Sequence, residues 1–144
     1  MRVSGILATK GATVATISPR STIAEAADEL RLRGIGALVV SPDGLSIDGI
    51  LSERDVVRAL AERGERILAE PVCDLMSAQV WTCAPEDSVE DLMRTMTERR
   101  TRHLPVTADG QLVGIVSIGD VVKWRLTELE DETRQLHEYI TTGR

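Results

Sequence analysis

The chain contains two copies of one sequence pattern, in Val14–Val57 and Val80–Val122. A shift of 66 positions aligns the first halves of the copies, and a shift of 65 aligns their second halves. The motif Gly-Ile-x-Ser-x-x-Asp then recurs as Gly49–Asp55 and Gly114–Asp120. A repeat of this length predicts two similar supersecondary units, with the function located where they meet.

A related leader precedes each copy, Val3–Leu7 before the first and Val72–Met76 before the second. A unit of about 55–65 residues buries too little surface to be comfortable alone, whereas 144 residues suit one compact domain. We therefore expect one globule. We assign residues 1–69 to the first repeat with its leader, 70–126 to the second with its leader, and 127–144 to a C-terminal helical extension.

Each copy has the pattern of a β-α-β-β-α unit. Alternating or β-rich runs predict strands at 14–17, 37–40 and 47–51, and at 80–83, 104–106 and 112–116. Helices are predicted to begin where a hydroxyl residue precedes an acid by three positions. All four predicted helices begin with this spacing, at Thr22, Ser52, Ser88 and Ser117.

The last helix is predicted to run beyond the repeat with an apolar stripe. The stripe follows 4/3 spacing and is interrupted only by Thr133; its members are Val122, Leu126, Leu129, Leu136 and Ile140. Such spacing is typical of a heptad surface. Two explanations stay open: the stripe packs on its own domain, or it contacts a second copy of the chain.

Net charge, the length of apolar runs and cysteine spacing argue against several classes of function. The formal net charge of -6 disfavours nucleic-acid binding, which depends on neutralising phosphates. No apolar run approaches the ~20 residues of a membrane span, and no signal-peptide segment is evident. Cys73 and Cys83 lack a CxxC spacing, so we expect two buried or half-buried thiols in a cytoplasmic protein.

Catalytic motifs are missing from the sequence. The two histidines, His103 and His137, are far apart, and neither has a partner at metal-binding spacing. There is no GxSxG, Walker A or GxGxxG motif. We expect no enzyme activity, no catalytic cofactor and no metal.

Binding has stronger support, from Ser52-x-x-Asp55 and Ser117-x-x-Asp120. Each lies where a strand ends and a helix begins, and a helix N-terminus attracts phosphate. An aspartate one turn into the helix can accept two hydrogen bonds from the hydroxyls of a ribose. Ordinary capping explains the same spacing, so the motif alone does not decide between the two.

A basic run, Arg99–His103, is the second indication of a binding site. Arg99 suits the C-terminal end of a helix, where a cation is favoured, and we interpret it as solvated charge. Arg102 and His103 instead lie at the entry to a strand that contains Pro105. They are candidates for contacting an anion.

The first copy has Gly36 and Ala37 at the corresponding strand entry. The two half-sites are therefore not equivalent, because one offers basic side chains and the other only backbone. Arg54, between Ser52 and Asp55, is a further candidate cation.

These residues resemble the CBS domain family, named for cystathionine β-synthase, whose domains occur as tandem pairs. The resemblance rests on the two leaders, the proline after each first strand, the segment Arg102–Val106 and the repeated Gly-Ile-x-Ser-x-x-Asp. It covers the chain from about Val3 to Leu126. The chain is most similar to small stand-alone bacterial proteins made of a CBS pair and a short C-terminal helix.

The resemblance implies an α/β (α+β) fold with two tandem β-α-β-β-α repeats. They would pack sheet to sheet with pseudo-two-fold symmetry and leave two clefts between them. Such pairs commonly bind adenosyl compounds, including AMP, ADP, ATP, NAD and S-adenosylmethionine. Members of the family usually associate as flat, disc-like dimers.

Carried over by position, the resemblance assigns Asp55 and Asp120 to ribose and Ser52 and Ser117 to ribose or phosphate. Arg102 and His103 would contact phosphate, and Gly36 and Ala37 would lie at the strand entry. The remaining candidates near the ligand are Arg54 and Pro105. Backbone facing the adenine would come from Thr16, Ile17 and Ser18 and from Thr82 and Cys83. Two positions depart from the family pattern: Gly5 replaces an acidic residue, and Cys83 occupies a usually aliphatic or β-branched position.

The leading hypothesis is a non-catalytic regulatory module. It would bind an adenine nucleotide, AMP before NAD, ADP or ATP, and convert occupancy into a change of conformation or assembly. We expect a homodimer and an unidentified effector protein as partners, and neither nucleic acid nor membrane. The alternative is a structural or protein-interaction module with degenerate clefts, which acts through dimerisation by its C-terminal helix.

Overall fold

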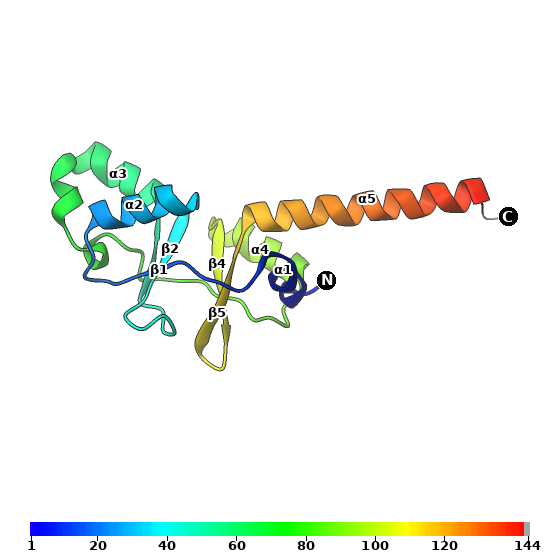
Figure 1. Cartoon of the computed structure of the whole chain (residues 1–144), viewed down its shortest axis with the longest axis horizontal. Coiled ribbons are helices and arrows are strands. Elements are labelled where there is room, and N and C mark those ends of the chain that lie inside the picture. The colour runs from blue at the N-terminus through cyan, green and yellow to red at the C-terminus, as the bar shows by residue number, and fades with distance from the viewer. Residues whose placement is uncertain (143–144) are drawn as a thin grey trace.

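The computed structural model describes residues 1–142 of the chain. Figure 1 shows two lobes side by side, with one long helix, α5, projecting from the second. The first lobe contains α2, α3 and the strands β1 and β2, and the second contains α1, α4, β4 and β5. The expected order β-α-β-β-α is thereby largely reproduced in each lobe.

The first repeat forms a three-stranded sheet covered by two helices. Its elements are β1 (Thr16–Ile17), α2 (Ile23–Arg33), β2 (Ala37–Val40), β3 (Gly49–Ser52) and α3 (Glu53–Arg63). β1 pairs parallel with β2, and β2 pairs antiparallel with β3. The predicted hairpin around Asp43 and Gly44 is confirmed, with strands slightly displaced from the expected bounds.

The second repeat is built from α4 (Val89–Arg99), β4 (His103–Ala108), β5 (Gln111–Ser117) and α5 (Ile118–Thr142). β4 and β5 form an antiparallel pair with an irregularity between Val106 and Thr107. The remaining elements are α1 (Val3–Lys10) and two 3-10 segments, η1 (Glu65–Ala69) and η2 (Val72–Asp74).

The predicted strand at 80–83 is wrong, because only Cys83 forms a bridge, to Val106. In the first repeat, the N–H of Val39 donates to the carbonyl of Ala15, which extends the parallel pairing. Pro105 stands at the position of Val39 and has no N–H to donate to Trp81. The pairing therefore stops after a single residue.

Hydroxyl caps start the helices where the sequence predicts. The Oγ1 of Thr22 accepts from the N–H of Glu25, and the Oγ of Ser88 accepts from the N–H of Asp91. The Oγ of Ser52 accepts from the N–H of Asp55 at 3.2 Å, while the Asp55 carboxylate accepts from the N–H of Ser52 at 2.9 Å. These bonds satisfy backbone donors that a helix leaves free at its start.

The two leaders pack on opposite repeats. Val3 and Ile6 of α1 belong to the hydrophobic core of the second repeat. Val72 of η2 belongs to the core of the first repeat, together with the nearby Ile67. Each leader therefore packs into the core of the other repeat, and this exchange ties the two lobes together. The residue boundaries assigned to the repeats from sequence stay a prediction.

Two glycines at equivalent strand positions allow the leaders to pack closely against the strands. A Cβ added at Gly49 would lie 2.6 Å from Met76 Sδ and 2.7 Å from the carbonyl oxygen of Ser77. A Cβ added at Gly114 would lie 2.8 Å from a methyl carbon of Leu7. Since Leu7 and Met76 occupy matching positions in the two leaders, these contacts follow the pseudo-two-fold symmetry of the pair.

Helix α5 leaves the body of the protein after its first turns. Val121 is buried in the second core, and Trp124 packs against it. The predicted stripe lies exposed, with Leu126 at 55% and Leu136 at 60% of full exposure. Packing of the stripe on its own domain is therefore not what the structure of residues 1–142 shows.

Candidate functional site

Two cavities lie at the junction of the repeats, with volumes of about 610 and 560 Å³. The first contains Asp55 and the second contains Asp120. Four of the predicted site residues line both cavities; they are Gly36, Ala37, His103 and Ser117. The repeated motif therefore places one aspartate in each of two symmetry-related clefts, and the Asp55 cleft and the Asp120 cleft are named accordingly.

The first turns of two helices line the Asp55 cleft. Ser52, Glu53 and Arg54 come from the start of α3, and Ile118 and Gly119 from the start of α5. Because helix N-termini carry partial positive charge and expose backbone N–H groups, both favour an anion in this cavity.

Arginine side chains dominate the rim of the Asp55 cleft. Five of them line it: Arg54, Arg58, Arg99, Arg100 and Arg102. None of the five pairs with a carboxylate anywhere in residues 1–142. Such a concentration of unpaired cations in a chain of net charge -6 creates a local field suited to phosphate.

Arg99 is exposed in the last turn of α4, as the sequence predicts for a solvated charge at a helix end. It also lines the cleft, and its guanidinium lies 4.0 Å from the ring centroid of Trp81. This distance is within the range of a cation–π interaction. Trp81, which also lines the cleft, thereby holds a cation at the rim.

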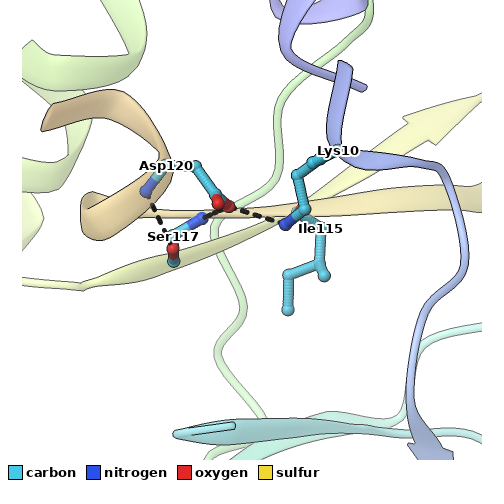
Figure 2. A network of polar contacts seen from close by, with 4 residues as sticks. All are labelled: Lys10, Ile115, Ser117 and Asp120. Atoms are coloured by element: carbon cyan, nitrogen blue, oxygen red, sulfur yellow. Dashed lines mark hydrogen bonds and ion pairs between the residues drawn. The ribbon is translucent and has the colours of Figure 1, made fainter. Parts of the chain in front are cut away.

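The Asp120 cleft contains an ion pair between the first helix, α1, and the last helix, α5. The Lys10 ammonium, at the end of α1, lies 2.6 Å from Asp120 Oδ2 and donates to the carbonyl oxygen of Ile115 at 2.8 Å. The same Oδ2 accepts from the N–H of Ser117 at 2.9 Å. Figure 2 shows Lys10 reaching across to the first turn of α5.

These contacts decide the charge state of Asp120. Burial opposes ionisation, but hydrogen bonds from Lys10 and the N–H of Ser117, with the Lys10 charge, hold the pKa of Asp120 below its usual value. The carboxylate is therefore ionised at neutral pH.

The two clefts differ most clearly at one residue that follows each leader and lies beside the aspartate. The offset of 69 that aligns the leaders places Lys10 on Gln79. Gln79 lines the Asp55 cleft just as Lys10 lines the Asp120 cleft. Asp120 consequently has a cationic partner from the exchanged leader, while Asp55 has a neutral residue at the equivalent place.

His103 lies between the clefts. Its imidazole lies close to Gly36, since a Cβ built there would be 3.5 Å from His103 Cε1. Burial lowers the pKa of His103; Asp120 and Glu53 oppose this, and Lys10 and Arg102 add to it. We expect the His103 ring to be neutral, with one ring nitrogen able to donate a hydrogen bond and the other able to accept one.

Nine of the fifteen predicted site residues line these clefts. Besides the four shared residues, Ser52, Arg54, Asp55 and Arg102 line the first, and Asp120 lines the second. Six do not line either one: Thr16, Ile17, Ser18, Thr82, Cys83 and Pro105. Ile17, Cys83 and Pro105 are buried. Slightly earlier residues line the clefts instead, namely Thr13, Ala15 and Gln79 to Trp81.

The cysteines differ in exposure. Cys73 is exposed, which contradicts the expectation that both thiols are at least half buried. Cys83 is buried with its Sγ 3.8 Å from the carbonyl oxygen of Pro105. Burial, with a contribution from Asp87, raises the pKa of Cys83 to about 12.

Sequence reasoning did not identify several cleft residues. Arg58 follows Arg54 by one helical turn, and that spacing could have revealed it. Arg33 likewise lies in the last turn of α2 beside the predicted Gly36. For Lys10 no local signal exists, because its role depends on the exchange of leaders.

Comparison with known proteins identifies the family. A model of the CBS domain matches residues 4–62 and 72–127. The chain belongs to the CBS domain family. It carries the domain twice, as a CBS pair, and this confirms the resemblance and the fold class predicted from the sequence.

Three relatives illustrate the range of the match. The crystal structure of the CBS-domain containing protein ATU1752 from Agrobacterium tumefaciens is 42% identical, with a TM-score of 0.84 over 87% of this chain and 99% of that one. The CBS domain protein PAE2072 from Pyrobaculum aerophilum, complexed with AMP, is 29% identical, with a TM-score of 0.73 over 83% and 89%. The mitochondrial CBS domain-containing protein CBSX3 of Arabidopsis thaliana is 36% identical over 85% of this chain, which spans 61% of that relative's length.

Two kinds of feature are absent from residues 1–142. None of the helices in this part of the chain combines the length and the hydropathy that a membrane span requires. Nor does any group of three or more His, Cys, Asp or Glu side chains in that part of the chain lie in a metal-binding arrangement.

Proposed function

We propose that this CBS pair is a non-catalytic regulatory module that binds adenosine nucleotides in its two clefts. AMP is the first candidate, followed by NAD, ATP and ADP. The observation that carries the proposal is the pair of cavities between the repeats, each with one aspartate at the start of a helix. The AMP bound to the Pyrobaculum relative supports the choice of ligand class.

The aspartates suit a ribose because capping leaves acceptor capacity. In Asp55 the N–H of Ser52 engages only Oδ2, and Oδ1 has no hydrogen-bond partner in residues 1–142. A carboxylate has about four acceptor positions. Asp55 can therefore cap its helix and still accept from both hydroxyls of a ribose.

Phosphate would be bound at the arginine rim of the Asp55 cleft. Arg102 and Arg54 lie on different repeats, so a phosphate between them would connect the lobes. Arginine binds phosphate through two parallel N–H groups, which fixes orientation as well as charge. Each added phosphate would meet further unpaired cations in this cleft.

Helix α5 offers a route from the clefts to an output. It begins at Ile118 in the Asp55 cleft, has Asp120 in the Asp120 cleft, and continues without a break to Thr142. A ligand that preferred one orientation of this first turn would reorient the whole projecting helix. Occupancy changes the equilibrium only if the ligand binds the two arrangements with different affinity. An effector protein would read the result.

The test is thermal unfolding with millimolar AMP, ADP, ATP, NAD, NADH and S-adenosylmethionine. A ligand at 100 times its Kd adds about 2.7 kcal/mol, which corresponds to roughly 5–10 °C in a domain of this size. We expect a selective upward shift of the Tm. Asp55→Asn and Asp120→Asn should reduce it while preserving an acceptor for the capping bond.

Asp91→Asn is the matched control. Asp91 follows its cap Ser88 by three residues, as Asp55 follows Ser52, but it lines neither cleft. It should leave the ligand-induced shift unchanged. A flat response across the panel would contradict nucleotide binding and favour the interaction module, for which the exposed stripe of α5 is the supporting observation.

A further inference from the structure

The exposed stripe on α5 has the residue pattern of one half of a two-stranded coiled coil. Position d is occupied by Val122, Leu129 and Leu136, and position a by Leu126, Thr133 and Ile140. Two of the three d positions are leucine and two of the three a positions are β-branched, a combination that favours two strands, and a polar residue at one a position fixes register. Five of the six side chains are large apolar groups that are 42–68% exposed.

The opposite face of α5 is the one that contacts the body. Val121 is buried at position c, Trp124 packs on the second core from position f, and Glu128 at position c is half buried. Positions c and f point away from the a/d seam. A second helix can therefore lie along the stripe on the face of α5 that is turned away from its own domain. Figure 1 shows α5 projecting beyond the second lobe.

The flanking charges distinguish parallel from antiparallel pairing. In a parallel pair, each g residue faces the e residue five positions later in the other chain. This places Arg125 opposite Glu130, and Glu132 opposite His137. An antiparallel pair matches e with e and g with g, which would bring Glu130 against Glu130 and Glu132 against Glu132.

We propose that α5 pairs in parallel and in register with α5 of a second copy of this chain. The seam from Val122 to Ile140 is about 28 Å long at 1.5 Å per residue. Because this is less than three full heptads, the association is reversible and concentration-dependent. The two CBS pairs then lie at the same end of the coil and on opposite sides of it. This inference does not depend on nucleotide binding.

Sedimentation equilibrium of the full chain between about 1 and 200 µM tests the pairing. We expect a monomer–dimer equilibrium that Leu129→Asp with Leu136→Asp shifts fully to monomer. The matched control is Val57→Asp, which places a charge at an apolar residue of α3 that is also exposed. A wild-type monomer throughout, or a dimer lost only in Val57→Asp, would overturn the proposal.

Orientation is tested by a charge exchange and by cross-linking. Arg125→Glu and Glu130→Arg should each weaken the dimer severalfold, and the double variant should restore it. In a Cys73→Ser background, Leu126→Cys should form an intermolecular disulfide, because equal positions of a parallel pair are adjacent. Failure of the double variant to recover, together with no disulfide, would overturn the parallel arrangement. Circular dichroism shows whether each variant is folded.

Discussion

Lys10 is expected to make the Asp120 cleft the weaker ribose site. Its ammonium and the N–H of Ser117 both bond Asp120 Oδ2, so one carboxylate oxygen is fully engaged. In Asp55 the corresponding oxygen has one such partner. A ribose that uses both oxygens must displace Lys10 from Asp120, whereas Gln79 imposes no equivalent cost at Asp55.

The magnitude follows from the exposure of the pair. The Lys10 and Asp120 side chains are 31% and 23% exposed, so the pair is partly screened. Exposed ion pairs contribute about 0.2–1 kcal/mol and hydrogen bonds to charged groups about 1.5–3 kcal/mol. We take about 1 kcal/mol, which equals roughly a fivefold change in an equilibrium constant.

Lys10→Gln should therefore lower the free energy of unfolding by about 1 kcal/mol and tighten adenosine binding at Asp120 about fivefold. Adenosine is the appropriate probe because it has no phosphate for Lys10 to attract. The titration is performed by calorimetry in an Asp55→Ala background, which isolates the second cleft. The reverse exchange, Gln79→Lys in Asp120→Ala, should weaken adenosine binding by a similar factor.

Two outcomes would refute this reasoning. Unchanged adenosine affinity in Lys10→Gln would mean that the ion pair does not compete with the ribose. Weaker binding would mean that Lys10 contacts the ligand instead of obstructing it. Loss of stability without any gain in affinity would leave Lys10 as a clasp between the leader and the second repeat.

Three further predictions concern packing, thiol reactivity and pH. Gly49→Ala should destabilise the protein by about 1–3 kcal/mol in chemical denaturation, and Gly114→Ala by less, because the first meets leader backbone and the second only a flexible side-chain end; equal losses would contradict this. One thiol, Cys73, should react quickly with an aromatic disulfide reagent in the native protein, and Cys83 only after unfolding, because its burial and raised pKa suppress the thiolate. The lowered pKa of His103 means that the unfolded chain binds this proton more readily, so stability should fall as pH drops below about 6.5. His103→Gln should make that decline shallower, and an unchanged pH profile would count against the buried neutral ring.

Local patterns predicted most of the fold. Thr22, Ser52, Ser88 and Ser117 were identifiable as caps because capping depends on residues three apart. The stripe of α5 was visible because helical periodicity needs no knowledge of the rest of the molecule. The failed strand at 80–83 depended on Pro105, a residue distant in sequence that removes one donor from the pairing.

The clefts were predictable in part for the same reason. Asp55 and Asp120 belong to a repeated local motif, and the structure places one in each cavity. Lys10 and Trp81 reach the clefts only because of tertiary packing. Arg99 lies exposed at the end of α4 as predicted, but the sequence did not show that a cavity lies beside it.

The most direct test of unequal nucleotide sites is equilibrium dialysis with radiolabelled AMP on the wild-type chain and on Asp55→Asn. We expect two sites per wild-type chain with different affinities, and loss of the tighter one in the variant. The weaker site should remain and should be removed by adding Asp120→Asn. Absence of saturable binding, or two equal sites unaffected by Asp55→Asn, would contradict the proposed function of the clefts.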